Sequence, residues 1–256
     1  VSYPDYEHFR DNSGQFRAMA AYIAPVPFVI KTDDNRSSRA WGHLVTPNYF
    51  DVFQTGAAIG RTFGTAESAQ GAPASLVVSH RFWQGRLGGD PSVIGSTLRI
   101  NGYPATIIGV AEEDFFGALP IMSAADIWLP TTVDPRVAPE LGSDALHDKE
   151  IAAFSIAGRL SEGITRQGAE AALDAIIRQQ EVDEGATDIR EGRRITLLPG
   201  GRLLPIRDED LPVMMAFPLI LSGLALLIAC SNVGTLLLAR GSARAKEIAI
   251  RLSVGA

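Results

Sequence analysis

The segment LPVMMAFPLILSGLALLIACSNVGTLLLA, residues 211–239, decides the architecture of this chain because it contains no charged residue. A helix of this length, rising about 1.5 Å per residue, would be roughly 43 Å long, which exceeds the ~30 Å of hydrocarbon in a bilayer. The alternative is a buried helix of a large soluble domain, but such helices seldom run this long without a charge. The sequence therefore predicts one transmembrane helix, which we place with its flanks at residues 208–241.

The residues on either side of this helix predict its orientation. An acidic run at 208–210 precedes the helix, and the basic residues that follow it are Arg240, Arg244, Lys246 and Arg251. Acidic side chains suit the positive end of a helix dipole, and the cytoplasmic flanks of membrane helices are enriched in Lys and Arg. We therefore expect residues 1–210 to be extracytoplasmic and the tail, residues 242–256, to be cytoplasmic.

The external part, residues 1–207, is long enough for one large domain or two small ones. Its fold must depend on core packing, because the chain's only cysteine, Cys230, lies in the predicted membrane helix. The formal net charge of −6 argues against nucleic acid as a partner. Since the sequence opens on Val1 and closes on Gly255-Ala256 in mid-pattern, we expect a fragment of a longer protein.

Helical and strand patterns are interspersed along the external part and predict a mixed α/β (α+β) domain. Helices are predicted at 2–12, 47–53, 80–87 and 165–180. Strands are predicted at 18–30, 39–46, 76–78, 97–100, 103–110, 126–130, 152–160 and 194–198, and a turn at 33–35. Two prolines in 18–30 predict an edge strand. Asn101-Gly102 predicts a hairpin, because both residues tolerate φ > 0.

Motifs for catalysis or cofactor binding were not found in the sequence. There is no GxxxxGK[ST] phosphate loop, no HExxH zinc motif and no GxSxG elbow. The histidines His8, His43, His80 and His147 are isolated. The acidic run 112–114 fits a solvated loop better than a cation site, and a hydrolase built on its carboxylates is the weakest hypothesis. We expect no enzyme activity, no cofactor and no metal.

Small and polar residues form one stripe along the predicted membrane helix: Ser222, Ala225, Ala229 and Asn232. Small side chains allow a second helix to approach closely, and an Asn amide can form a hydrogen bond across the contact. The alternative is that such residues are common in any membrane helix. We favour a helix–helix packing face.

The tail after the membrane helix is short and basic. It is either a solvated flank or a helix that lies beneath the membrane and docks a cytoplasmic partner. The segments Asn232-Val233, 236–240 (LLLAR) and 247–252 (EIAIRL) make the helix and tail similar to the membrane helix and cytoplasmic turn of FtsX/MacB-type ABC transporter permeases.

The external part resembles the MacB-like periplasmic core domain. The matching pieces include YPDY at 3–6, VTPNYF at 45–50, GRTF at 60–63, GGDP at 88–91 and LRING at 98–102, and further matches extend over nearly the whole chain. The sequences of these matching segments are most similar to those of the large duplicated orphan permeases of bacteria. Permeases of this type have four membrane helices per unit, of which this chain contains one.

The resemblance implies a two-lobed periplasmic domain, in which a split lobe from both ends of the domain surrounds an inserted β-rich lobe. It implies a permease subunit in a bacterial inner membrane that couples ATP hydrolysis by a separate ABC ATPase subunit to domain motion or export, a process called mechanotransmission. A second permease unit or homodimer and a periplasmic partner are also implied.

The resemblance also assigns a role to the tail, in which the ATPase-coupling segment would contain Arg244, Glu247, Ile248, Arg251 and Leu252. The alternative from another functional class is a membrane-anchored extracytoplasmic binding or scaffolding module without ATPase coupling.

Overall fold

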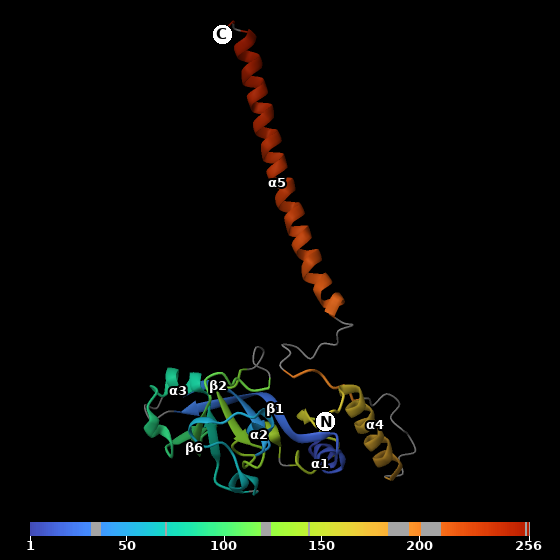
Figure 1. Ribbon diagram of the computed structural model, residues 1–256. Helices are drawn as coiled ribbons and strands as arrows, with labels where there is room; N and C mark the ends of the chain where they lie inside the picture. The colour runs from blue at the N-terminus through green and yellow to red at the C-terminus, as the bar shows by residue number, and fades with distance from the viewer. Residues whose placement is uncertain are drawn as a thin grey trace. The chain divides into compact units, whose positions relative to one another are not determined.

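The computed structural model describes residues 1–31, 37–69, 71–118, 124–142, 144–183, 195–200, 211–253 and 255. The chain divides into two compact units, Val1–Leu204 and Pro205–Ala256, which we describe separately (Figure 1). In its described residues, the first unit contains one sheet and four α-helices. The second contains one long helix.

The predicted helices at 2–12, 47–53, 80–87 and 165–180 are confirmed. The helices are α1 (Tyr3–Asn12), α2 (Tyr49–Phe53), α3 (His80–Arg86), α4 (Arg166–Asp183) and α5 (Leu211–Ser253). The strands are β1 (Phe16–Lys31), β2 (Ser37–Val45), β3 (Ala57–Gly60), β4 (Ser75–Val78), β5 (Thr97–Ile100), β6 (Tyr103–Ala111), β7 (Ile127–Pro130) and β8 (Ser155–Leu160). Single 3₁₀ turns occur at Thr65–Ser68, Pro91–Val93 and Pro139–Leu141.

The eight strands form one sheet in the order β2-β7-β4-β6-β5-β1-β8, with β3 paired to β6. Because β1 also pairs with β2, the strands from β2 to β1 form a closed circuit, and β8 and β3 lie outside it. Closing a sheet on itself removes exposed strand edges and encloses the inward-facing side chains. The inward residues Phe28, Leu44 and Ile107 are accordingly almost completely buried.

The expectation that residues 18–30 form an edge strand was wrong. β1 has neighbours on both sides, because its first half pairs with β8, its second half with β2, and its last residues also with β5. The register with β2 shifts between Ile23 and Val26, which places Pro25 in an irregular part of the ladder. A proline has no N–H to donate, so it is tolerated in a long paired strand where the ladder is interrupted.

The predicted hairpin between β5 and β6 is confirmed. Asn101 and Gly102 both adopt positive φ, at 50° and 89°. The Asn101 side chain adds long-range contacts: its Oδ1 accepts the Val29 N–H at 2.9 Å and its Nδ2 donates to the Val137 carbonyl at 2.9 Å. The local turn signal therefore also positions the end of β1 and a distant loop.

Both ends of the domain meet around α1 and α4, which contact each other (Figure 1). α1 begins with a capping box, in which Ser2 and Asp5 exchange side-chain to backbone hydrogen bonds. α4 buries Ala169, Leu173 and Ile177, the face that the sequence pattern predicted. Together with β8 and the first half of β1, these helices form the split part around the β-rich insertion.

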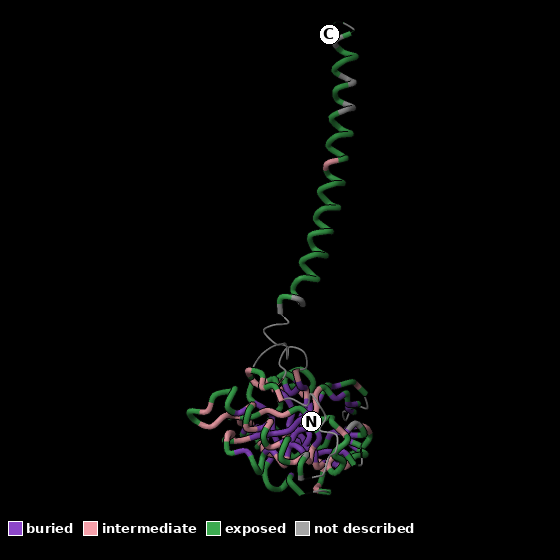
Figure 2. Tube along the Cα trace, turned by 90° about the vertical axis from the view of Figure 1, so that its right-hand side faces the viewer, coloured by how far each residue is buried: buried purple, intermediate pink, exposed green. Residues whose placement is uncertain are grey.

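Buried residues are concentrated in the first unit, as Figure 2 shows, and α5 is exposed along its length. A second apolar cluster lies outside the sheet circuit. It joins α2, β7 and the loop after β6 through the rings of Tyr49, Phe50, Phe115 and Trp128, whose neighbouring centroids are about 6 Å apart or less. Aromatic pairs at this separation add specific stabilisation to ordinary burial.

The strand predicted at 194–198 was wrong for its described part, residues 195–198, which have no strand partner. Instead, the Ile195 N–H donates to Asp174 Oδ1 at 3.1 Å and the Leu197 N–H to Glu170 Oε1 at 2.7 Å. Carboxylates on α4 thus take the place of a neighbouring strand's carbonyls. Arg194 and the predicted turn at 33–35 lie outside the described residues.

Candidate functional site

The second unit is built on α5, which is long and apolar enough to cross a bilayer. Its apolar span, Met215–Gly241, is 27 residues long with a mean hydropathy of 2.0, and none of its most apolar stretch is buried. At about 1.5 Å per residue the span is roughly 40 Å long, more than a bilayer's hydrocarbon core requires. In water such a surface would be strongly unfavourable, so α5 requires a lipid or protein environment.

The predicted packing stripe lies on one face of α5. Ser222, Ala225, Ala229 and Asn232 follow one another at three- and four-residue spacing, and all four are exposed. Within the described residues nothing packs on this face, because all four of its side chains are exposed. The geometry therefore leaves room for a second helix, and the packing role stays a prediction.

The predicted membrane segment and tail, which we expected to be distinct, form one uninterrupted helix that ends at Ser253. The five coupling residues all lie in its last three turns. Arg244, Ile248 and Arg251 have exposed side chains at i, i+4 and i+7, so they share one face. Glu247 and Leu252 belong to the same helix, but their side chains lie outside what the structure describes.

The VTPNYF segment at 45–50 organises the external domain. Thr46 exchanges two hydrogen bonds with Ala21, through its own N–H at 2.9 Å and its Oγ1 at 3.1 Å. Asn48 Nδ2 donates to the Met19 carbonyl at 2.7 Å. These contacts provide hydrogen-bond partners for the backbone groups of β1 that face away from β8. The Tyr49 hydroxyl accepts the Ala118 N–H at 2.8 Å, and burial raises the pKa of this hydroxyl.

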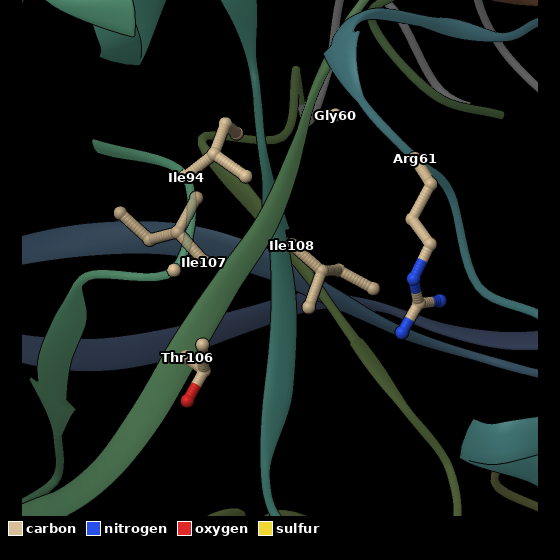
Figure 3. A pocket seen from close by; sticks show the side chains of 7 residues that line it. Gly60, Arg61, Ile94, Thr106, Ile107 and Ile108 are labelled. Atoms are coloured by element: carbon tan, nitrogen blue, oxygen red, sulfur yellow. The ribbon is translucent and has the colours of Figure 1, made fainter. Parts of the chain in front are cut away.

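Gly60 and Arg61, the first two residues of the GRTF segment at 60–63, form one wall of a shallow apolar pocket of about 420 Å³. Its other residues are Ile94, Gly95, Thr106, Ile107 and Ile108. In the view of Figure 3, Ile108 lies between Ile94 and the Arg61 side chain. The Arg61 guanidinium forms an ion pair with the buried Glu67 at 2.7 Å, and this hydrogen bond lowers the pKa of Glu67.

Three side chains of types that occur in catalytic or metal sites, Ser79, His43 and Glu112, have structural roles here. Ser79 Oγ accepts the Phe82 N–H at 3.1 Å and caps α3, and His43 is packed between the rings of Tyr22 and Trp128. The Glu112 carboxylate accepts from Thr55 and Gly56. Among the described residues no three metal-ligating side chains gather at one point.

A family model described as the MacB-like periplasmic core domain matches residues 1–176. The chain belongs to this family. The match ends within α4, so it contains the complete sheet circuit, the VTPNYF segment and the shallow pocket.

Relatives and solved structures agree with this assignment. The macrolide export ATP-binding/permease protein MacB of Escherichia coli K12 is 25% identical over 217 residues, which are 83% of this chain and 30% of the relative. The chain therefore spans about a third of the length of that relative. A permease-protein domain from Porphyromonas gingivalis has a TM-score of 0.54 at 20% identity, covering 73% of this chain and 75% of that one. The periplasmic region of MacB from Actinobacillus actinomycetemcomitans has a TM-score of 0.50 at 14% identity, covering 71% of this chain and 75% of that one.

Two surface features of this MacB-like domain were missed in the sequence. The first is the shallow pocket, whose residues come from three separate stretches of chain, 60–61, 94–95 and 106–108, and meet only in the folded domain. The second is an exposed face on β1 and β2 that carries Val29, Lys31, Arg39 and Trp41. The sequence offered little signal for this face, because residues 26–30 (VPFVI) are all apolar and the alternation of exposed and buried residues is seen only in the folded strands.

Proposed function

We propose that this chain is the extracytoplasmic domain and adjoining membrane helix of a permease subunit of an ABC-type transporter. Its membership in the MacB-like periplasmic core domain family and its candidate membrane helix support this role. We further propose that the basic tail binds a separate cytoplasmic ATPase chain and couples ATP hydrolysis to motion of the external domain or to export.

The continuity of α5 is the observation on which this coupling rests. One helix carries both the apolar span and the tail, without a break before Ser253. A continuous helix transmits axial or rotational displacement, whereas a loop at the membrane surface would absorb it. The exposed face of Arg244, Ile248 and Arg251 combines two cations with one apolar side chain, a composition that suits a protein contact.

The same geometry supports the proposed surroundings of the chain. The external unit would be periplasmic and the tail cytoplasmic in a bacterial inner membrane, because the basic residues follow the apolar span. The stripe from Ser222 to Asn232 would contact another membrane helix, contributed by the same subunit or by a second permease unit. The chain itself would contribute no catalytic residue, and hydrolysis would occur on the ATPase.

The complete protein, reconstituted in proteoliposomes with its ATPase, tests the coupling role. The double variant Glu247→Ala/Arg251→Ala should insert into the membrane normally but bind the ATPase about 10- to 100-fold more weakly, the loss expected for an interface hot spot. Ser253→Ala, at the end of the same helix, is the matched control and should leave ATPase binding unchanged. Full ATPase binding and coupled activity in the double variant would contradict the proposal.

A membrane-anchored binding module is the second candidate function. The exposed apolar and cationic face on β1 and β2 favours it, because that face can bind a partner without any ATPase. Cells that carry a hydrolysis-deficient ATPase distinguish the two functions. Loss of function in those cells supports the permease role, and intact function supports the binding module.

A further inference from the structure

Strand register brings one row of exposed side chains together on the outside of the sheet circuit. Along β1, Pro27, Val29 and Lys31 are exposed, while the intervening residues 28 and 30 are buried. β1 pairs with β2 so that Pro27 is opposite Trp41 and Val29 is opposite Arg39, and both partners are exposed. These residues therefore share one face, because strand residues that oppose each other point to the same side of a sheet.

The face extends onto β5. Lys31 is opposite Arg99 in the β1–β5 pair, and Arg99 is also exposed. We call the set Pro27, Val29, Lys31, Arg39, Trp41 and Arg99 the cationic face.

Two large apolar side chains stand out on the cationic face. Val29 is 53% exposed and Trp41 is 42% exposed, and the remaining tryptophans of the chain, Trp83 and Trp128, are buried. The Arg39 guanidinium lies 5.9 Å from the centroid of the Trp41 ring, a cation–π contact that holds both side chains on the surface. The domain thus presents an ordered aromatic ring to its surroundings.

Within the described residues, no carboxylate compensates the charge of this face. Lys31, Arg39 and Arg99 form no ion pair with any carboxylate of the described residues. Asp126, directly before β7, accepts the Trp41 N–H at 3.0 Å, and its carboxylate pairs with Arg81 at 3.0 Å. An uncompensated positive patch on a chain of net charge −6 attracts a negatively charged partner.

We propose that the cationic face is a docking site for an acidic segment of a partner protein. The Trp41 ring, supported by Val29 and Pro27, would bury an apolar side chain of that segment, and the surrounding cations would pair with its carboxylates. Trp and Arg are the residues that most often dominate binding energy at protein interfaces. This docking goes beyond the proposed permease function, since it requires neither ATP nor the tail.

A binding titration of the full chain in detergent tests the site. The probe is a synthetic ten-residue peptide of glutamates around two central leucines, and intrinsic fluorescence reports on Trp41. We expect a saturable blue shift of the emission, and affinity should fall by about tenfold or more between low salt and ~0.3 M salt, because screened ion pairs contribute less.

Charge reversal provides the decisive comparison. The variant Lys31→Glu/Arg39→Glu/Arg99→Glu should lose binding of the glutamate peptide and gain binding of the equivalent lysine peptide. The matched control reverses three exposed cations elsewhere in the domain, in Arg17→Glu/Arg166→Glu/Arg178→Glu, and should bind the glutamate peptide within about threefold of wild type. Trp41→Leu, measured by calorimetry, should weaken binding without changing its dependence on salt.

Three outcomes would overturn the proposal. Equal loss of peptide binding in both charge-reversed variants would indicate general attraction to cations. Displacement of the peptide by phosphatidylglycerol vesicles, with equal affinity for the vesicles, would assign the face to a lipid surface. A salt-sensitive dimer of the full chain that charge reversal of the cationic face dissociates would assign it to a second copy.

Discussion

Asn48 Nδ2 donates a 2.7 Å hydrogen bond to the backbone carbonyl of Met19, in the middle of the first half of β1. This carbonyl points away from β8. On that side, no strand of the described chain offers an N–H to donate to it. The amide of Asn48 is held in place by Thr46, whose hydroxyl donates to Asn48 Oδ1 at 2.8 Å. A side-chain pair at the end of β2 therefore completes a backbone edge 29 residues away.

Removing this amide should destabilise the domain. We expect Asn48→Ala to lower the free energy of unfolding by about 1–2 kcal/mol, because Thr46 loses its acceptor and the Met19 carbonyl keeps only the Tyr6 hydroxyl at 3.2 Å. Urea titration of the full chain, followed by tryptophan fluorescence, measures this change, since all three tryptophans lie in the external domain. Gln167→Ala, at an exposed position of α4, is the control. Equal midpoints for Asn48→Ala and the control would contradict the assignment.

Two glycines with positive φ distinguish the cost of backbone strain from the cost of a steric clash. Gly117 has a φ of 91°, and a Cβ at this position would lie 2.7 Å from His43 Cε1. Gly95 has a φ of 84°, but a Cβ there would meet nothing. Gly95→Ala should cost about 1–2 kcal/mol from the backbone alone, and Gly117→Ala about 1–3 kcal/mol more, because the buried His43 ring would have to move.

The same urea titration compares the two glycine variants directly. A larger loss of stability for Gly95→Ala than for Gly117→Ala would show that the loop carrying Gly117 is not packed on His43 as described.

The ion pair of Arg61 with Glu67 should make stability depend on acid pH. Hydrogen bonds from the Arg61 guanidinium and from the Gly64 N–H hold the pKa of Glu67 below its ordinary value of 4.5. A carboxyl whose pKa is lower in the folded state stabilises the fold at pH values above 4.5. That contribution is lost as the pH falls from 4.5 through the folded-state pKa.

The free energy of unfolding should therefore decline less steeply between about pH 5 and pH 3 in Glu67→Gln than in the wild-type chain. The exposed substitution Glu162→Gln serves as the reference. Identical slopes for Glu67→Gln and the wild type would contradict a role for this ion pair in the folded state.

The contacts of Ile195 and Leu197 with α4 predict a local effect on hydrogen exchange. Their N–H groups donate to the carboxylates of Asp174 and Glu170. In Glu170→Ala/Asp174→Ala both amides lose their acceptors, so their exchange should accelerate about tenfold or more, while amides inside β1 keep their protection. Glu162→Ala is the control, and unchanged exchange at both positions would show that the carboxylates do not hold this segment.

Local signals in the sequence predicted those parts of the fold that local chemistry decides. Asn101-Gly102 predicted a hairpin because both residues tolerate positive φ. The helix predicted at 2–12 is found as α1, whose start is fixed locally by a capping box of Ser2 and Asp5. The position of β1 could not be predicted in this way. Its prolines indicate an edge, but two of its partners, β5 and β8, are distant in sequence, and only the joint packing of the strands shows that β1 is paired on both sides.

The same distinction applies to the surfaces proposed for function. The apolar span and the basic tail are continuous in sequence, so composition alone located them. The cationic face depends on which residues of β1, β2 and β5 lie opposite each other, and a shift of one residue in that register would turn Trp41 inward. The segment at 195–198 alternates as a strand would, but the acceptors for its N–H groups are side chains that the pattern could not identify.

The central claim is that this chain belongs to a permease that an ATPase moves, and purification of the complete protein from its own membranes in detergent tests it most directly. The measurement is the ATP hydrolysis rate of the preparation, with the native tail and with the Glu247→Ala/Arg251→Ala tail. We expect that an ATPase chain co-purifies and that its hydrolysis rate changes when the tail is altered. A preparation that contains no ATPase, or one whose rate is the same with both tails, would contradict it.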